Sequence, residues 1–340
     1  MWSVSTRLEA IAAPVALWRA WRGYRAGKRR RPAVARFELD CERHVLTLSR
    51  ELLGGSYRHG RYRLLRVDDP KPRLIAVAGV RDRVVHRALY DALSPEMDRA
   101  FIADSYACIP GRGGHRAVLR FLQHMRRHRY LVHLDVHRFF PSVDHATLRA
   151  LLARRVRDRR VLVVFDEVLR TGDELYRRPE VLRFFELSPT ERPRGLPIGN
   201  LTSQWWGNVY MDGLDRFVKR ELGVAGYCRY LDDMVLFADE ASKLRGWRDD
   251  VREWLVRERR LKLKPGCGQV RPTRLPHTWL GHRVTRAGYD LGPKAIRRFR
   301  KGLRRLAASG DEGRLRRLAA SGDEGRLRRT LASWNGAISF

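Results

Sequence analysis

Two stretches of the sequence decide the fold: YLVHLDVHRFFPSVDH at residues 130–145 and YCRYLDDMVLFAD at residues 227–239. The first begins as a short apolar run, which predicts a buried strand that ends near Asp135. The second predicts two short strands around a turn at Asp232 and Asp233. Two adjacent carboxylates inside an apolar hairpin are costly unless a cation compensates their charge. Asp135 and Asp232 would together form an oxygen-rich site of the kind that Mg²⁺ prefers.

The charge of the chain indicates a partner that carries many negative charges. Its 340 residues include 70 Lys and Arg against 38 Asp and Glu, a net charge of +32. Nucleic acid is the commonest such partner, although an Arg-rich proteome would also raise the charge. Two Mg²⁺ ions can activate a 3′-hydroxyl and stabilise a leaving pyrophosphate. A basic chain with this carboxylate site is therefore expected to polymerise or cleave nucleic acid.

Composition excludes several classes of protein. The length suits two domains, or one large domain with subdomains, at about 150 residues per domain. No apolar run reaches the roughly 18 residues of a membrane span, and the N-terminus lacks a signal-peptide pattern. None of the four cysteines forms a C-x-x-C pair, which argues against a zinc ribbon and a disulfide scaffold. We therefore expect a cytoplasmic protein without a membrane partner.

Hydrophobic spacing and turn residues predict the remaining elements. The segment 158–194 is mixed, polar and Arg-rich, and LAASGDEGRLRR occurs twice, at 306–317 and 318–329. Two copies are too few for a solenoid and indicate a duplication that lengthens a helical element. We expect helices over 1–36, 37–54, 82–128 with a loop at 110–114, 145–157, 203–222, 240–260 and from about 293, a hairpin within 57–80, and short strands at 261–265 and 278–284.

The sequence resembles the reverse transcriptases. YLDD at 230–233 is similar to their Y-x-D-D box, and LDVHRFFPSVDH at 134–145 is similar to their first catalytic motif. Further similar segments follow in the right order over about residues 28–335, which makes the resemblance specific. They are the fingers-like strings at 68–89 and 101–117, the second motif at 195–219, LKLKP at 261–265 as the fourth motif, and WLGHRV at 279–284 as the primer grip.

This resemblance implies an α+β fold of the right-hand polymerase type, with fingers, a palm of antiparallel sheet plus helices, and a short helical thumb. The expected parts are a basic N-terminal helical extension at 1–36, fingers at 37–130, a palm at 131–285 that contains the inserted segment 158–194, and a thumb at 286–340 with the duplicated repeat.

The resemblance also implies the metal site. Asp135, Asp232 and Asp233 are the expected catalytic carboxylates, and Asp233 could instead be a turn residue alone. Together with Val136 they are expected to hold two Mg²⁺ ions, for which Mn²⁺ can substitute. The family often has a Lys after L-x-L-x-P, but here Cys267 stands about there. Lys264 is therefore the candidate general acid.

Substrate contacts follow from the same resemblance, with primed template RNA and dNTPs as the expected partners. Lys71, Arg73 and Arg81 are candidates to hold the incoming phosphates, with ordinary surface charge as the alternative. Phe140 is expected to exclude a 2′-hydroxyl, with a core aromatic as the alternative, and Phe139 to offer a backbone contact. Gly199 and Gln204 are expected beside the templating base and nucleotide. The expected nucleic-acid contacts are Lys28, Arg29, Arg30, Arg31, Trp279, Leu280 and Gly281.

The subtype signal is IGNLTSQ at 198–204, which resembles the reverse transcriptases of diversity-generating retroelements. The resemblance implies error-prone copying of a template-repeat RNA and a small basic accessory protein as partner. Another bacterial reverse transcriptase, of a defence system, retron-like or CRISPR-linked, is an open alternative. A catalytically silent RNA-binding scaffold is a second one, which the retained carboxylates disfavour.

Overall fold

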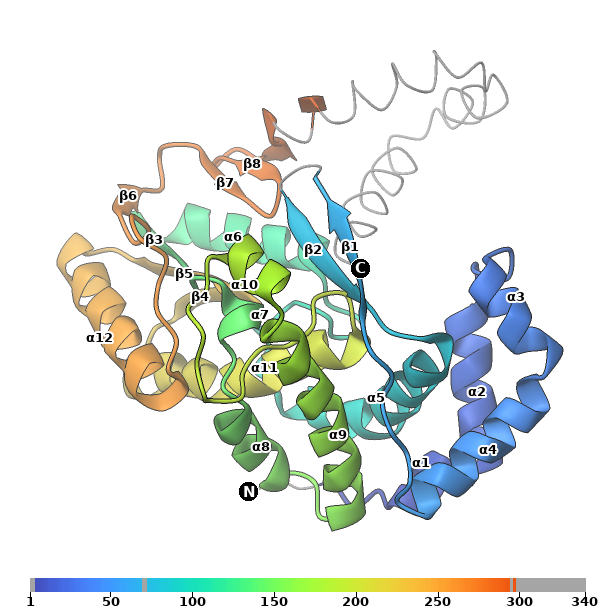
Figure 1. Cartoon of the computed structure of the whole chain (residues 1–340). Helices are drawn as coiled ribbons and strands as arrows, with labels where there is room; N and C mark the ends of the chain where they lie inside the picture. Colours follow the sequence, from blue (N-terminus) through green and yellow to red (C-terminus); the bar gives the residue numbers. More distant parts are fainter. Residues whose placement is uncertain (1–3, 69–71, 294–295, 298–340) are drawn as a thin grey trace, which may run out of the picture.

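The computed structural model describes residues 4–68, 72–293 and 296–297. Its first helices pack together at one end of the molecule (Figure 1). Three of the helices described here have a proline in their first turn. Proline suits this position because an N–H in the first turn would have no partner within the helix. The described part of 1–54 is largely helical as expected, with breaks at Ala13, over residues 26–31 and at Asp40. The helices are α1 Leu8–Ala12, α2 Pro14–Arg25, α3 Pro32–Leu39 and α4 Cys41–Leu53.

A four-stranded antiparallel sheet forms the centre of the molecule, with strand order β4-β5-β3-β6. Alternate residues of β3 and β5 face opposite sides. Leu131, Val235 and Phe237 pack into one apolar cluster, whereas Val132 and Leu236 pack into the other. Both faces are thus buried, as the continuous apolar runs predicted. The strands are β3 Tyr130–Asp135, β4 Gly226–Tyr230, β5 Asp233–Ala238 and β6 Val270–Pro272.

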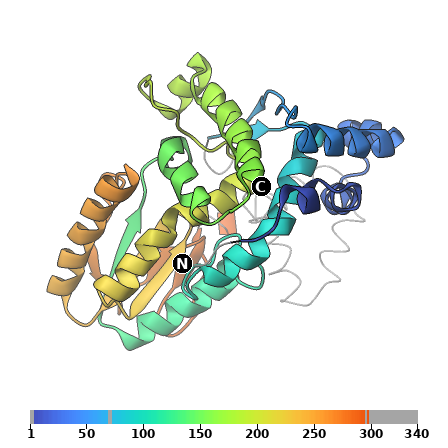
Figure 2. The same ribbon diagram turned by 90° about the horizontal axis from the view of Figure 1, so that it is seen from below.

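Helices cover the two faces of this sheet (Figure 2). Helix α6, Gly114–Arg127, supplies Phe121 to the cluster that contains Val235 and Phe237. Helix α8 begins at the cap residue Asp144, whose carboxylate accepts a hydrogen bond from Thr147 N–H at 2.8 Å. The opposite face meets α8 His145–Ala153, α11 Leu201–Arg216 and α12 Ala241–Arg259, and the π-helix η1 Phe217–Glu221 continues α11.

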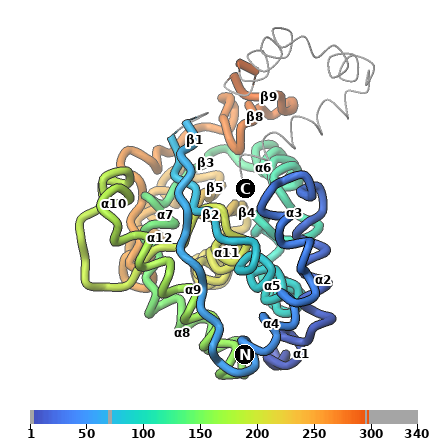
Figure 3. The backbone as a smooth tube through the Cα atoms, turned by 45° about the vertical axis from the view of Figure 1, so that its right-hand side comes forward, coloured from blue at the N-terminus to red at the C-terminus, as the bar shows by residue number. Residues whose placement is uncertain are grey.

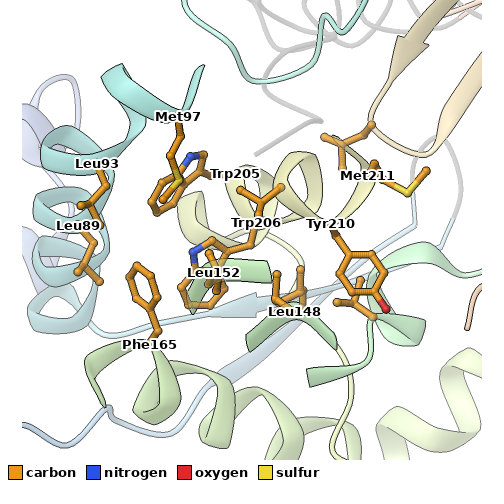
Figure 4. Packing of buried hydrophobic residues seen from close by; sticks show 14 of the residues in the cluster. Leu89, Leu93, Met97, Leu148, Leu152, Phe165, Trp205, Trp206, Tyr210 and Met211 are labelled. Carbon is orange, nitrogen blue, oxygen red and sulfur yellow. The ribbon is translucent and has the colours of Figure 1, made fainter. Parts of the chain in front are cut away.

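The largest core lies where α11 crosses α5, Val80–Ala100, and α9, Arg159–Tyr176 (Figure 4). The rings of Trp205 and Trp206 from α11 are both fully buried. Trp206 meets Phe165 of α9 edge-on, with ring centroids 5.1 Å apart. This packing joins α11, which lies on the central sheet, to α5 and α9.

The fingers hairpin forms as expected, from β1 Arg63–Val67 and β2 Arg73–Val77. The chain that leads into it runs between α2 and α3 on one side and α9 and α10 on the other (Figure 3). A second small sheet contains β7 His277–Trp279, β8 His282–Val284 and β9 Tyr289–Leu291.

The segment 158–194, for which no element was predicted, contains two helices, α9 and α10 Pro179–Phe185, because its apolar residues line one buried face of α9. Two expectations about local structure are corrected. LKLKP at 261–265 makes only an isolated bridge from Leu263 to Val136. The stretch 278–284 is part of a hairpin rather than one strand, since Leu280 and Gly281 have positive φ angles of 46° and 79° and turn the chain.

The described part of the expected thumb starts with strand β9 rather than with a helix. The duplicated repeat lies outside the described residues. Within the residues that the structure describes, no helix is both long enough and apolar enough to cross a bilayer.

Candidate active site

The sheet brings the two acidic motifs together at one end. Strands β3 and β5 are antiparallel, so the end of β3 meets the beginning of β5, and Asp135 pairs with Asp233. Asp232 lies in the turn between β4 and β5. The N–H of Val136 donates to the backbone oxygen of Asp232 at 3.1 Å, which ties the two motifs. Residues almost a hundred positions apart therefore share one site.

The three carboxylates interact electrostatically. Burial raises the pKa of Asp232 to about 7, and the negative charges of Asp135 and Asp233 contribute to the same shift. Like charges disfavour ionisation of a group, and a nearby cation favours it. The site therefore holds more negative charge than its protein surroundings neutralise.

Two of the carboxylates have cationic or hydrogen-bonding partners. Lys264 Nζ lies 3.3 Å from Asp135 Oδ2. Asp233 Oδ1 accepts hydrogen bonds from His133 Nε2–H and Trp279 Nε1–H, both at 2.7 Å. Burial lowers the pKa of His133, but the hydrogen bond to Asp233 and the charge of that carboxylate outweigh burial, so the pKa is raised. These contacts orient Asp135 and Asp233 separately.

The donor set fits Mg²⁺ by its chemistry. All three side chains offer oxygen, which is the ligand atom that this ion prefers, and a divalent cation would relieve the charge around Asp232. Across residues 4–68, 72–293 and 296–297, no three His, Cys, Asp or Glu side chains already surround a single point. Because Asp135 pairs with Lys264, its carboxylate would turn on binding an ion.

A buried arginine supports the turn that contains Asp232. Arg229 and Asp215 are both 0% exposed, and the guanidinium donates to both oxygens of that carboxylate at 2.6 Å. Burial lowers the pKa of Arg229, but Asp215 more than offsets this and the pKa is raised. Arg229 also donates to the carbonyl oxygen of Leu231 at 2.8 Å, directly before Asp232. The sequence analysis missed this residue, although an Arg between apolar strand positions was the available signal.

The two phenylalanines of the first motif have different surroundings. The Phe139 ring is buried and lies where a Cβ on Gly207 would be 3.1 Å from it. Phe140 is partly exposed and meets Phe139 edge-on, with centroids 5.3 Å apart. Phe140 is thus the ring with surface available to a substrate, on the short helix α7 Phe139–Ser142.

Gly199 and Gln204 contact other protein groups. Gly199 has φ +104°, and a Cβ there would lie 2.7 Å from Ile75 Cγ2 of β2. The N–H of Ala76 donates to Ile198 O at 2.8 Å, so this glycine lets the fingers hairpin approach the second motif. Gln204 Oε1 accepts a hydrogen bond from the Cys108 thiol at 3.3 Å. The space left by the missing side chain of Gly199 is therefore occupied by strand β2 of the same chain.

Two of the three expected phosphate-binding cations lie among the described residues. Arg81 forms an ion pair with Glu51 and donates to Arg58 O at 3.0 Å, which holds its side chain within the fingers. Arg73 opens β2 opposite Val67. Lys71 lies outside the described residues.

The residues expected to contact nucleic acid differ in their exposure and in their partners. Lys28 donates to Tyr24 O at 3.0 Å, and Arg29 pairs with Glu38 at 2.9 Å. Arg30 and Arg31 are exposed. Trp279 is only 1% exposed, so its ring supports Asp233 and has no surface for a nucleic acid. Its neighbours Leu280 and Gly281 form the β7–β8 turn.

The chain is similar to several known proteins. Residues 67–284 match the family described as reverse transcriptase (RNA-dependent DNA polymerase). Protein YkfC of Escherichia coli is 25% identical over 280 residues, which cover 69% of this chain and 70% of that protein. An uncharacterised 91 kDa protein in a cob intron of Schizosaccharomyces pombe is 24% identical over 150 residues, 43% of this chain and 17% of that protein. The structure of apo telomerase from Candida tropicalis aligns with TM-score 0.44 and 9% identity, over 70% of this chain and 49% of that one.

Proposed function

The chain belongs to the reverse transcriptase family, and we propose that Asp135, Asp232 and Asp233 are the carboxylates with which it extends a primer. Template nucleic acid and dNTPs are the substrates of such an enzyme. The observation that supports this assignment is the pairing of Asp135 with Asp233 beside Asp232, whose pKa is raised to about 7 by burial and by both neighbouring charges.

The roles of the side chains follow from their positions. Asp135, Asp232 and Asp233, with the backbone at Val136, would hold two Mg²⁺ ions, for which Mn²⁺ can substitute. The bound ions supply electrostatic stabilisation of the attacking and leaving oxygens. Phe140 offers a partly exposed ring to the sugar, which a 2′-hydroxyl would crowd. Lys264 carries an ammonium group 3.3 Å from Asp135 and can donate a proton to the leaving pyrophosphate.

The test is incorporation of dNTPs on a primed RNA template in the presence of Mg²⁺ or Mn²⁺. The wild-type chain is expected to extend the primer, and Asp232→Asn is expected to lose extension while still binding the primed template. Equal extension by Asp232→Asn would remove the metal assignment.

We further propose that the template is the repeat RNA of a diversity-generating retroelement and that a small basic protein assists its copying. The support is the string IGNLTSQ at 198–204, whose Gly199 lies against the fingers hairpin. Sequencing of cDNA made from a defined RNA tests this subtype. Errors concentrated at template adenines would support it, and an even error spectrum would favour another bacterial reverse transcriptase.

A further inference from the structure

The carboxylate of Asp233 is held through only one of its oxygens. Oδ1 accepts two hydrogen bonds of 2.7 Å, from His133 Nε2–H and Trp279 Nε1–H. An ionised carboxylate offers about two acceptor positions on each oxygen. The two donors therefore occupy Oδ1, and Oδ2 makes no hydrogen bond to any residue that the structure describes.

Aromatic packing fixes both donors. Trp279 stacks on Phe121 of α6 with ring centroids 5.1 Å apart, and His277 stacks on the same ring at 5.7 Å. His277 Nε2 lies 3.2 Å from His133 Nδ1, within hydrogen-bond distance. The rings of Trp279, His277 and His133 thus form a supported cluster behind Asp233.

The donors come from two different parts of the chain. His133 lies on β3, two residues before Asp135 and on the same face of the sheet. Trp279 lies on β7 in the hairpin whose turn contains Leu280 and Gly281. The hydrogen bond from Trp279 therefore links this hairpin directly to the third carboxylate.

We propose that Trp279 and His133 are positioning residues that hold Oδ1 of Asp233 and thereby leave Oδ2 to bind the catalytic metal ion. The inference rests on the proposed function, because it concerns the same carboxylates. Hydrogen-bond donors to a metal-binding side chain fix its orientation, and their loss typically weakens metal binding by about 10- to 100-fold. A role in packing alone would not depend on the indole N–H.

The chain offers a matched pair of variants for the test. Trp279→Phe removes the N–H and retains an aromatic ring against Phe121. Trp206→Phe is the control, because Trp206 is equally buried and its Nε1 has no hydrogen-bond partner among the described residues. Mn²⁺ affinity of the full chain is measured by electron paramagnetic resonance without nucleic acid, and Asp233→Asn serves as the reference for loss of the carboxylate.

We expect Trp279→Phe to weaken Mn²⁺ binding by about tenfold or more, and Trp206→Phe to leave it unchanged. Primer extension by Trp279→Phe is then expected to recover as the Mn²⁺ concentration rises, with the affinity for primed template unaltered. Mn²⁺ binding by Trp279→Phe equal to that of the wild type would overturn the proposal.

A second pair of variants covers failure of Trp279→Phe to fold. His133→Leu removes the other donor, whereas His133→Gln retains an N–H group. Weak Mn²⁺ binding by His133→Leu with recovery in His133→Gln supports positioning, and equal binding by the two contradicts it. If the wild type binds Mn²⁺ but incorporates no dNTP, the proposed function fails while these affinities still decide the positioning role.

Discussion

Asp135 lies directly opposite Asp233 in the antiparallel ladder between β3 and β5. Like charges at opposed positions of a sheet destabilise it. The protein accommodates them through different partners, Lys264 for Asp135 and the pair His133 and Trp279 for Asp233. Asp232 has neither of these partners, and its pKa is raised by burial and by repulsion from the two neighbouring carboxylates.

Asp232→Asn is expected to stabilise the metal-free protein. The pKa of Asp232, raised to about 7 in the fold from an ordinary 3.8, makes its ionised form unfavourable there. The gain in stability from the substitution should therefore be full above pH 7 and disappear as the pH falls toward 4. Thermal unfolding in EDTA across this range measures it, and each kcal/mol corresponds to roughly 2–4 °C. A lower melting temperature at pH 8 would contradict the expectation.

Lys264→Met is expected to change metal binding and catalysis in opposite directions. The ammonium group competes with a metal ion for Asp135, so its loss should tighten Mn²⁺ binding. Loss of the general acid should lower the maximal rate of primer extension by about 100-fold. The matched control is Lys262→Met, because Lys262 is exposed two residues earlier. Unchanged maximal rate in Lys264→Met would remove Lys264 from the proposed mechanism.

Arg229→Met is expected to destabilise the protein by about 3–5 kcal/mol, because Asp215 would remain buried and unpaired. Urea unfolding measures the loss. The double variant Arg229→Met with Asp215→Leu should recover much of the stability but not the activity, since the carbonyl of Leu231 still lacks its donor. Arg257→Met removes an exposed pair with Glu253 and should have no measurable effect. If Arg229→Met changed the free energy of unfolding as little as Arg257→Met does, the structural role given to Arg229 would be wrong.

His124 is expected to make the fold sensitive to acid. Burial, assisted by Arg120, lowers the pKa of His124 to about 3, and neither ring nitrogen has a described partner. Since the unfolded chain binds the proton more readily, the stability present above pH 6.5 should decline as the pH falls toward 3. The melting temperature of His124→Phe should therefore fall less over this pH range than that of the wild type. His115 is exposed on the same helix, so the melting temperature of His115→Phe should follow that of the wild type as the pH falls. If the melting temperatures of all three proteins fell in parallel, His124 would not be the source of the acid sensitivity.

Local patterns predicted the central sheet and the β1–β2 hairpin correctly. Apolar runs at 130–136 and 227–238 form strands because both faces of the sheet are covered, and β1 and β2 pair within the hairpin expected at 57–80. The pattern predicted no element at 158–194, where charged residues on the exposed face of α9 obscured its buried apolar stripe. It failed at 261–265, where alternating Leu and Lys form one bridge instead of a strand.

The sequence by itself determined that three carboxylates stand at the ends of apolar strands, because strand periodicity and the cost of adjacent like charges are properties of neighbouring residues. Only the tertiary structure decided which groups hold them. Trp279 reaches Asp233 across 46 positions of sequence, and Arg229 of strand β4 holds the carbonyl before Asp232 while paired with Asp215 of helix α11. Such contacts depend on which elements pack together, and the hydrophobic periodicity of neighbouring residues does not contain that information.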